Sequence, residues 1–203
     1  MLFVDLETGK WIVKFARKVI EKTVRGEIIE IPKGYPKTLN EKRGVFVTIL
    51  TYPDRELRGC IGLPYPTHPL IEGIVEAASQ ACFDPRFPPL KEEELKDVVI
   101  EVSILTKPQE IAVNNPMEYL EKIKIGEDGL MLISKYFSGL LLPQVPVEYN
   151  WDVRTFLENL CLKANLPKDC WMSPDVKIYK FQAEIFEEKS PNGEVGRKKI
   201  NNP

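Results

Sequence analysis

The sequence holds one histidine, His68, and only four cysteines, Cys60, Cys82, Cys161 and Cys170. No two cysteines form a Cys-x-x-Cys pair, and structural zinc or iron–sulfur sites need several Cys or His ligands at close spacing. We therefore expect no bound metal, no cofactor and no disulfide. Free thiols of this kind fit the reducing cytoplasm.

Other absences narrow the class of protein further. No run approaches the roughly 18–20 apolar residues that a membrane helix needs, and the first residues lack the pattern of a signal peptide. The net charge is −2, whereas a nucleic-acid-binding protein usually carries a basic surface. No glycine loop of the Walker or Rossmann type is present. We expect a cytoplasmic protein that binds no membrane, and the composition argues against nucleic acid as a partner.

Apolar residues at three- and four-residue steps predict three helices. They cover Glu7–Val24, with Gly26 as the stop, then Leu70–Cys82, and Trp151 to about Ala164, with Asn150 as the cap. The second of these helices follows a proline-rich stretch and is itself followed by the proline-rich segment 84–90.

Strands are predicted where β-branched and apolar residues gather between turn signals. The expected strands are Gly44–Leu50, Leu57–Ile61, Val98–Thr106, a hairpin over Ile123–Ile133 that turns at Asp128-Gly129, Gly139–Leu142 and Val176–Phe186. Together with the helices they predict an α+β or mixed α/β fold with a largely antiparallel sheet and flanking helices. We expect a single domain over residues 1–188, with two unequal lobes sharing a core, and a disordered polar tail over 189–203.

The segment Leu57-Arg58-Gly59-Cys60-Ile61-Gly62 has the parts of a thiol site. Arg58 would lie on the same face of a strand as Cys60 and would favour the thiolate, and His68 follows after a proline-rich turn. A thiol, a nearby base and glycine N–H groups are what nucleophilic cysteine catalysis requires. The same residues also fit a buried structural cysteine beside tightly packed glycines, or a binding site that includes Gly59 and Gly62.

Two further segments carry polar side chains near prolines. Gln144, Glu148 and Trp151 lie close together before a helix, and Gln144 and Trp151, with Arg58, are candidate ligand-binding residues. Glu148 could orient His68 as the third member of a triad, or could hold the loop to the helix start. Arg86, in the turn Asp84-Pro85-Arg86, could bind an anion or pair internally with an acid.

The Leu57–Gly62 segment resembles the signature motif of the AMME-syndrome-candidate family. The similarity continues in the same order over about Leu6–Phe186. It includes Ala77-Ala78, Asp84–Leu90, Glu101–Leu105, Ile123–Leu130, Gly139–Val145, Glu148, Trp151, Phe156-Leu157 and Cys161.

The resemblance implies a mixed α/β fold of two unequal lobes, with the motif near a cleft, and an association with radical-SAM and Memo-type proteins. It names no reaction, so the question of enzyme or binding protein stays open. The first hypothesis is an enzyme, or a component of one, that uses a cleft around Cys60 on a small molecule or a modified residue or base. The second is a non-catalytic adaptor that binds a ligand or a protein, and the third is a nucleic-acid-binding regulator.

Overall fold

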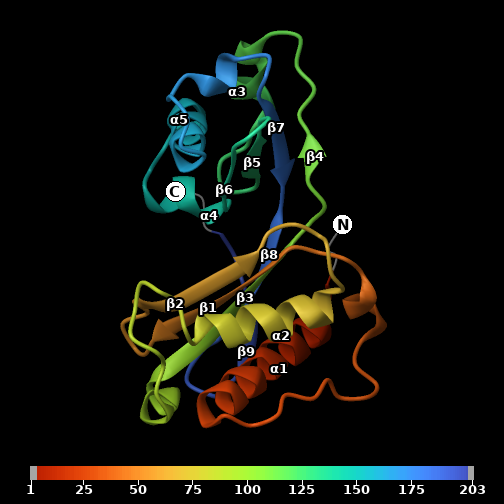
Figure 1. Cartoon of the computed structure of the whole chain (residues 1–203), viewed down its shortest axis with the longest axis vertical. Helices are drawn as coiled ribbons and strands as arrows, with labels where there is room; N and C mark the ends of the chain where they lie inside the picture. The colour runs from red at the N-terminus through yellow and green to blue at the C-terminus, as the bar shows by residue number, and fades with distance from the viewer. Residues whose placement is uncertain (1–3, 201–203) are drawn as a thin grey trace. The chain divides into compact units, whose positions relative to one another are not determined.

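The structure is a computed structural model that describes residues 4–200, and it divides into two compact units (Figure 1). Unit 1 comprises the described residues up to Leu105 together with Glu184–Lys198. Unit 2 comprises Thr106–Ala183 and the described residues from Lys199 onward. Each unit contains helices and an antiparallel sheet, so the predicted mixed α/β fold is confirmed. No helix among residues 4–200 has the length and apolar character needed to cross a membrane.

Unit 1 is built on a five-stranded sheet in the order β2-β1-β3-β8-β9. Its strands are β1 (Val45–Thr51), β2 (Leu57–Leu63), β3 (Val98–Leu105), β8 (Ala183–Glu188) and β9 (Val195–Lys198). β1 pairs antiparallel with both β2 and β3. Because side chains alternate between the faces of a strand, Val45, Val47 and Ile49 are buried on one face and Thr48 points to the other.

Helices α1 (Leu6–Arg25) and α2 (Leu70–Ala81) pack against one face of this sheet and against each other (Figure 1). α1 begins where the Asp5 carboxylate accepts a hydrogen bond from the N–H of Thr8. It ends at Gly26, whose φ of 68° is readily adopted only by glycine. The apolar stripes that predict these two helices form the core of unit 1 with β1 and β3.

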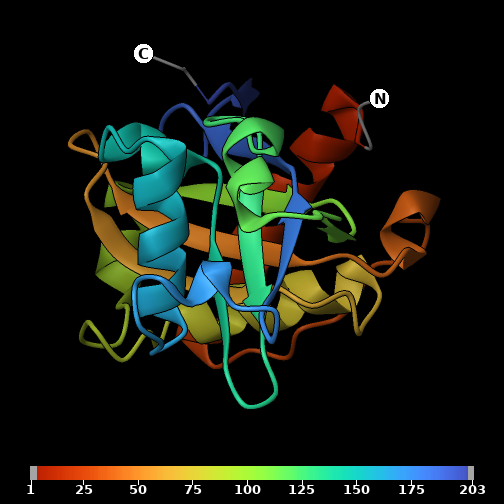
Figure 2. The same cartoon turned by 90° about the horizontal axis from the view of Figure 1, so that it is seen from above.

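Unit 2 is built on a four-stranded sheet in the order β4-β7-β5-β6. Its elements are β4 (Gln109–Glu110), α3 (Tyr119–Lys122), β5 (Gly129–Ile133), β6 (Ser138–Leu141), α4 (Gln144–Glu148), α5 (Val153–Lys163) and β7 (Lys177–Phe181). Short 3₁₀ helices complete both units: η1 (Lys37–Asn40), η2 (Glu92–Asp97), η3 (Pro116–Glu118) and η4 (Cys170–Met172). α5 lies beside β5 and β6 (Figure 2). The sequence predicts one shared core, whereas the buried apolar side chains form a second cluster within unit 2.

Two strand predictions are wrong in detail. Within 123–133 only Gly129–Ile133 is a strand, because the buried Asp128 carboxylate accepts a hydrogen bond from the N–H of Lys124 and closes a turn there. Gly126, with φ of 80°, supplies the left-handed residue, and β5 pairs with β6 and β7. The long strand predicted over 176–186 is broken at Gln182 into β7 and β8, which belong to different sheets.

The prediction of a disordered tail from residue 189 is also wrong for the described part of that segment. β9 pairs antiparallel with β8, and Val195 is buried. Lys198 donates a hydrogen bond to the Glu101 carboxylate, and Arg197 lies over the ring of Phe186. The polar composition therefore belongs to a sheet-edge strand, where charged side chains are common.

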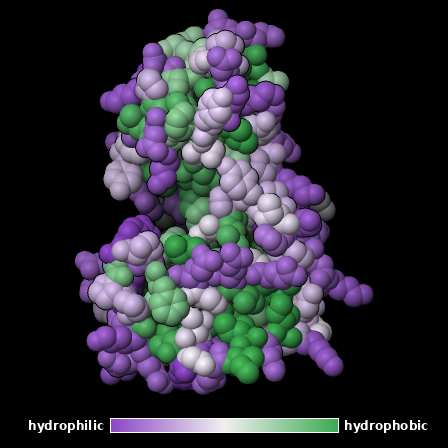
Figure 3. All heavy atoms as spheres, viewed as in Figure 1, coloured by the Kyte–Doolittle hydropathy of each residue, from purple (hydrophilic) through white to green (hydrophobic). Residues whose placement is uncertain are grey.

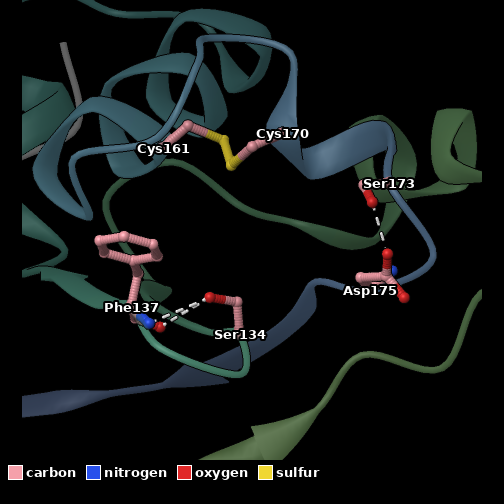
Figure 4. Close-up of a disulfide and its surroundings, with 6 residues drawn as sticks. All are labelled: Ser134, Phe137, Cys161, Cys170, Ser173 and Asp175. Carbon is pink, nitrogen blue, oxygen red and sulfur yellow. Dashed lines mark hydrogen bonds between the residues drawn. A yellow bond between two sulfur atoms is a disulfide. The ribbon is translucent and has the colours of Figure 1, made fainter.

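Cys161 and Cys170 form a disulfide, which corrects the prediction that all four cysteines are free (Figure 4). Cys161 lies in α5 and Cys170 begins η4, and their Cα atoms are 5.9 Å apart. The chain reverses direction between them through Asn165, whose φ is 56°. This tight reversal brings together two cysteines whose sequence spacing suggests no pairing.

Candidate functional site

Cys60 lies on β2 within a row of polar side chains that crosses the sheet of unit 1. The register places Thr48 of β1 opposite Cys60 on one side and opposite Glu101 of β3 on the other. The Thr48 hydroxyl donates a hydrogen bond of 3.2 Å to the Cys60 sulfur. Directly paired residues share a face of the sheet, so the thiol, the hydroxyl and the carboxylate lie in line.

Charged side chains extend this row toward the edge strand β9. Lys198 donates a hydrogen bond of 2.7 Å to the Glu101 carboxylate, which is almost fully buried. Glu187 of β8 is also buried, and it pairs with Arg55 and Lys189. Buried carboxylates are stable when they are paired and hydrogen-bonded, as these are. The row is therefore a preformed and largely buried polar network.

The proline-rich segment after α2 holds the backbone of Cys60. The Cys60 N–H donates to Asp84 Oδ2 at 2.8 Å. Arg86 pairs with the same carboxylate through Nε at 3.0 Å and Nη2 at 2.6 Å, and Nη2 also donates to the Cys60 carbonyl at 3.2 Å. The Arg86 guanidinium holds the pKa of the Asp84 carboxyl far below its usual range, so this acid stays charged. Of the two predicted roles of Arg86, the structure shows internal pairing.

The glycines beside Cys60 are required by packing. A Cβ on Gly59 would lie 2.4 Å from the carbonyl oxygen of Ala81, and one on Gly62 would lie 2.1 Å from the Phe46 ring. Only glycine allows both approaches without a shift of the neighbours. The sequence predicts this close approach but does not say whether a ligand or the protein makes it.

The environment of the thiol differs from the predicted one. Burial raises the pKa of Cys60, and the nearby Glu101 and Asp84 carboxylates raise it further, against the opposing effects of Thr48 and Arg86. Arg58 forms a two-pronged ion pair with Glu94, at 2.8 and 3.0 Å. The surroundings of Cys60 therefore favour the neutral thiol, and Arg58, which the sequence predicts to favour the thiolate, is paired with Glu94.

His68 is exposed in the loop before α2, and its Nδ1 lies 2.9 Å from the Thr67 hydroxyl. The described residues show no hydrogen bond between His68 and Cys60. The Cys60 sulfur instead accepts a hydrogen bond from the Thr48 hydroxyl. The structure therefore brings Cys60 together with Asp84 and Arg86, and it gives His68 a different neighbour.

The remaining predicted site residues belong to unit 2. Gln144 begins α4 and its Oε1 is buried with no hydrogen-bond donor among residues 4–200, while Glu148 ends the same short helix and is exposed. Trp151 stacks on Tyr149 with ring centroids 5.1 Å apart. The helix that follows is capped by Asp152 instead of the predicted Asn150. Glu148 as a partner of His68 stays a prediction.

Sequence reasoning missed Thr48 and Glu101, which complete the polar row. Each is a polar residue inside a strand whose other residues are mostly apolar and β-branched. The sequence does show a polar residue on the alternate face of each buried strand. Only the pairing register between the strands shows that these two residues lie in line with Cys60. No group of three or more His, Cys, Asp or Glu that could hold a metal ion is found among residues 4–200.

Comparison with known proteins gives one consistent answer. The AMMECR1 family model matches residues 13–186. Protein MJ0810 of Methanocaldococcus jannaschii is 58% identical, and the match covers 98% of this chain and 100% of that protein. Protein PH0010 of Pyrococcus horikoshii is 51% identical over 96% of each chain.

The solved structures show the same relationship. The crystal structure of the uncharacterized protein PH0010 from Pyrococcus horikoshii superposes with a TM-score of 0.92, at 49% identity over 98% of this chain and 100% of that one. Sequence and fold thus agree over nearly the whole length. The chain belongs to the AMMECR1 family.

Proposed function

We propose that this protein is a binding module whose motif surface, formed by Leu57–Gly62 and Asp84–Arg86, holds an anionic group of a ligand or partner protein against Arg86. The observation that carries the proposal is that Arg86 is held in a fixed conformation while its side chain stays exposed. Its side chain is 56% exposed, although two hydrogen bonds tie it to Asp84 and a third ties it to the Cys60 carbonyl, and the Asp84 side chain is only 2% exposed.

An arginine held in this way is suited to binding. A guanidinium has five N–H donors, and Nη1 has no hydrogen bond to any of residues 4–200. Because Asp84 fixes the side chain, little conformational entropy is lost when an anion binds to the free edge. Carboxylate and phosphate groups match the planar geometry of this edge.

The rival function is an enzyme that uses Cys60 as a nucleophile in a cleft. That reaction needs the thiolate, and the surroundings of Cys60 favour the thiol instead. The contacts of Cys60 also serve the motif itself, because its backbone N–H and carbonyl both bind the Asp84–Arg86 pair. These two observations support binding over catalysis.

The partner in this proposal presents a carboxylate or phosphate. A Memo-type or radical-SAM protein, which the family resemblance implies, would satisfy the requirement if an acidic segment or a bound phosphate lay at its surface. In that case the module would act beside the enzyme and not as the enzyme.

Thermal melting with inorganic phosphate as the probe tests the proposal. Sodium phosphate is compared with sodium chloride at the same ionic strength, so that general salt effects cancel. We expect phosphate to raise the Tm of the wild type by a few degrees, as binding to the folded state requires. The same addition should leave the Tm of R86Q unchanged.

Arg25 provides the matched control, since it is an exposed arginine paired with Glu92 at 2.8 Å and lies outside the motif. R25Q should respond to phosphate as the wild type does, and R86K should respond weakly, because an ammonium lacks the planar fork. An equal phosphate effect in R86Q and wild type, or none in the wild type, would contradict anion binding at Arg86.

A further inference from the structure

A groove of about 870 Å³ lies beside α1 in unit 1, between this helix and the irregular segment 29–33. Most of its lining is apolar: Trp11, Phe15, Val19, Ile29, Ile31 and Pro32. Figure 3 shows that hydrophobic surface gathers over unit 1 on the face where α1 and α2 lie. The volume is within the range of sites that bind small ligands or short peptide segments.

Lysines follow the edge of this groove. Lys14, Lys18 and Lys22 recur at four-residue steps on α1, and Lys33 lies on the opposite side together with the acidic Glu30, so the lining carries four lysines and one carboxylate. Lys22 donates to the carbonyl of Ile28, whereas Lys14, Lys18 and Lys33 have no ion pair or hydrogen bond with any of residues 4–200. At a rise of about 1.5 Å per residue, the helix carries this row over about 12 Å. The chain as a whole has a net charge of −2, so the lysine row is a local positive feature.

The segment opposite the helix leaves apolar side chains and backbone groups accessible. Ile28 is 80% exposed and Ile31 is 41% exposed. The backbone N–H groups of residues 28–31 and of Lys33 donate to no group within the described part of the chain, and Pro32 has no N–H. Exposed apolar side chains next to free backbone donors are a common feature of surfaces that receive a peptide.

We propose that this groove is a docking site for an acidic peptide segment of a partner protein, with apolar side chains on the floor and carboxylates against the lysine row. A lysine row about 12 Å long can neutralise several charges, whereas an anionic lipid or fatty acid brings one head group. The free backbone groups of 28–33 give a peptide main chain donors that an acyl chain cannot use. The aromatic residues of the floor, Trp11 and Phe15, stack on each other with ring centroids 5.0 Å apart. The other floor residues are aliphatic, and aliphatic side chains fit apolar peptide residues better than stacked bases.

This docking site is separate from the anion site proposed at Arg86, because it uses none of the same residues. An adaptor with both would hold its partner at two places on unit 1. The two proposals can fail independently, since the variants that test one leave the other intact.

Fluorescence anisotropy with a fluorescein-labelled peptide of alternating leucine and glutamate tests the docking site on the full-length protein. We expect saturable binding that weakens as salt rises. The variant K14E/K18E should bind about tenfold more weakly or worse, because two attractive contacts become repulsive. R86Q should bind like the wild type.

Lys163 and Lys168 supply the matched control. Both are exposed in unit 2, and K163E/K168E changes the net charge by the same amount as K14E/K18E. It should bind the peptide as the wild type does, and I31Q should weaken binding without any change of charge. Far-UV circular dichroism and thermal melting confirm that each variant is folded.

Three results would overturn the proposal. One is equal binding by K14E/K18E and K163E/K168E, which would show that only net charge matters. Another is equal affinity for a peptide with glutamine in place of glutamate. The last is tighter binding of an oligothymidylate or of phosphatidylserine vesicles that K14E/K18E abolishes, because the groove would then serve a nucleic acid or a membrane.

Discussion

Unit 1 and unit 2 join separate segments of the chain by different chemistry: unit 1 uses a buried ion pair and unit 2 uses a disulfide. In unit 1 the buried Arg17 of α1 pairs with the buried Glu188 of β8, with Nε–Oε1 and Nη2–Oε2 distances of 2.5 Å. In unit 2 the Cys161–Cys170 disulfide joins α5 to η4. The ion pair depends on charge and hydrogen bonds, and the disulfide depends on redox state.

The ion pair is stable because every charged group in it has partners. Arg17 also donates to the carbonyls of Leu95 at 3.2 Å and Val98 at 2.7 Å, and Glu188 accepts from the N–H of Ile100 at 3.1 Å. Burial of two charges becomes tolerable only with such a complete set of bonds. Because of this difference, we expect acid and substitutions of charged residues to destabilise unit 1 first, and a reducing agent to destabilise unit 2 first.

The largest expected effect is that of R17M, which leaves the Glu188 carboxylate buried without its cation. We expect a loss of about 3–5 kcal/mol in the free energy of unfolding, measured by urea denaturation. R25M, which removes an exposed pair with Glu92, should cause no measurable loss. A loss in R17M as small as that in R25M would show that the buried pair does not hold unit 1 together.

Removal of the disulfide should have a smaller effect that appears only under oxidising conditions. Its nine-residue separation corresponds to about 2–3 kcal/mol of chain entropy in the unfolded state. We expect dithiothreitol to lower the stability of the wild type by about this amount. The same reagent should have no effect on C161A/C170A, whereas C82A should respond like the wild type. A reductant effect that persists in C161A/C170A would contradict this assignment.

Asp84 should make the stability of unit 1 depend on pH. Its pKa is depressed in the folded state, so it contributes stability above its unfolded pKa of about 3.9 and loses that contribution as the pH falls toward the folded value. D84N leaves the Cys60 N–H and Arg86 poorly paired and should cost about 1–3 kcal/mol at neutral pH. The stability difference between wild type and D84N should shrink below about pH 4. A difference that is constant from pH 7 to 2.5 would show that the pKa of Asp84 is the same in the folded and the unfolded protein.

Periodicity and turn signals predict most of unit 1. The apolar stripe of α1 and its stop at Gly26 appear where the sequence places them, as do α2 and the hairpin of β1 and β2. These elements depend on local patterns: the 3.6-residue repeat, alternation and glycine at a helix end.

The features that the sequence does not reveal depend on contacts between distant residues. Glu101 reaches the neighbourhood of Cys60 only through the register of three strands, and Arg58 turns to Glu94 instead of the thiol. The Cys161–Cys170 bond likewise depends on a reversal of the chain that no spacing rule describes. Local propensity cannot encode such pairings, which follow from the packing of the whole unit.

Alkylation of Cys60 by iodoacetamide as a function of pH tests most directly whether this residue is a protonated thiol in a binding surface. Mass spectrometry of the digested protein separates Cys60 from Cys82, whose pKa burial raises to about 12. We expect labelling of Cys60 in the folded protein to rise with a midpoint above the usual thiol value of about 8.5, and to be unchanged in H68A. A midpoint well below 8.5 that moves upward in H68A would contradict the account and establish a Cys60–His68 dyad.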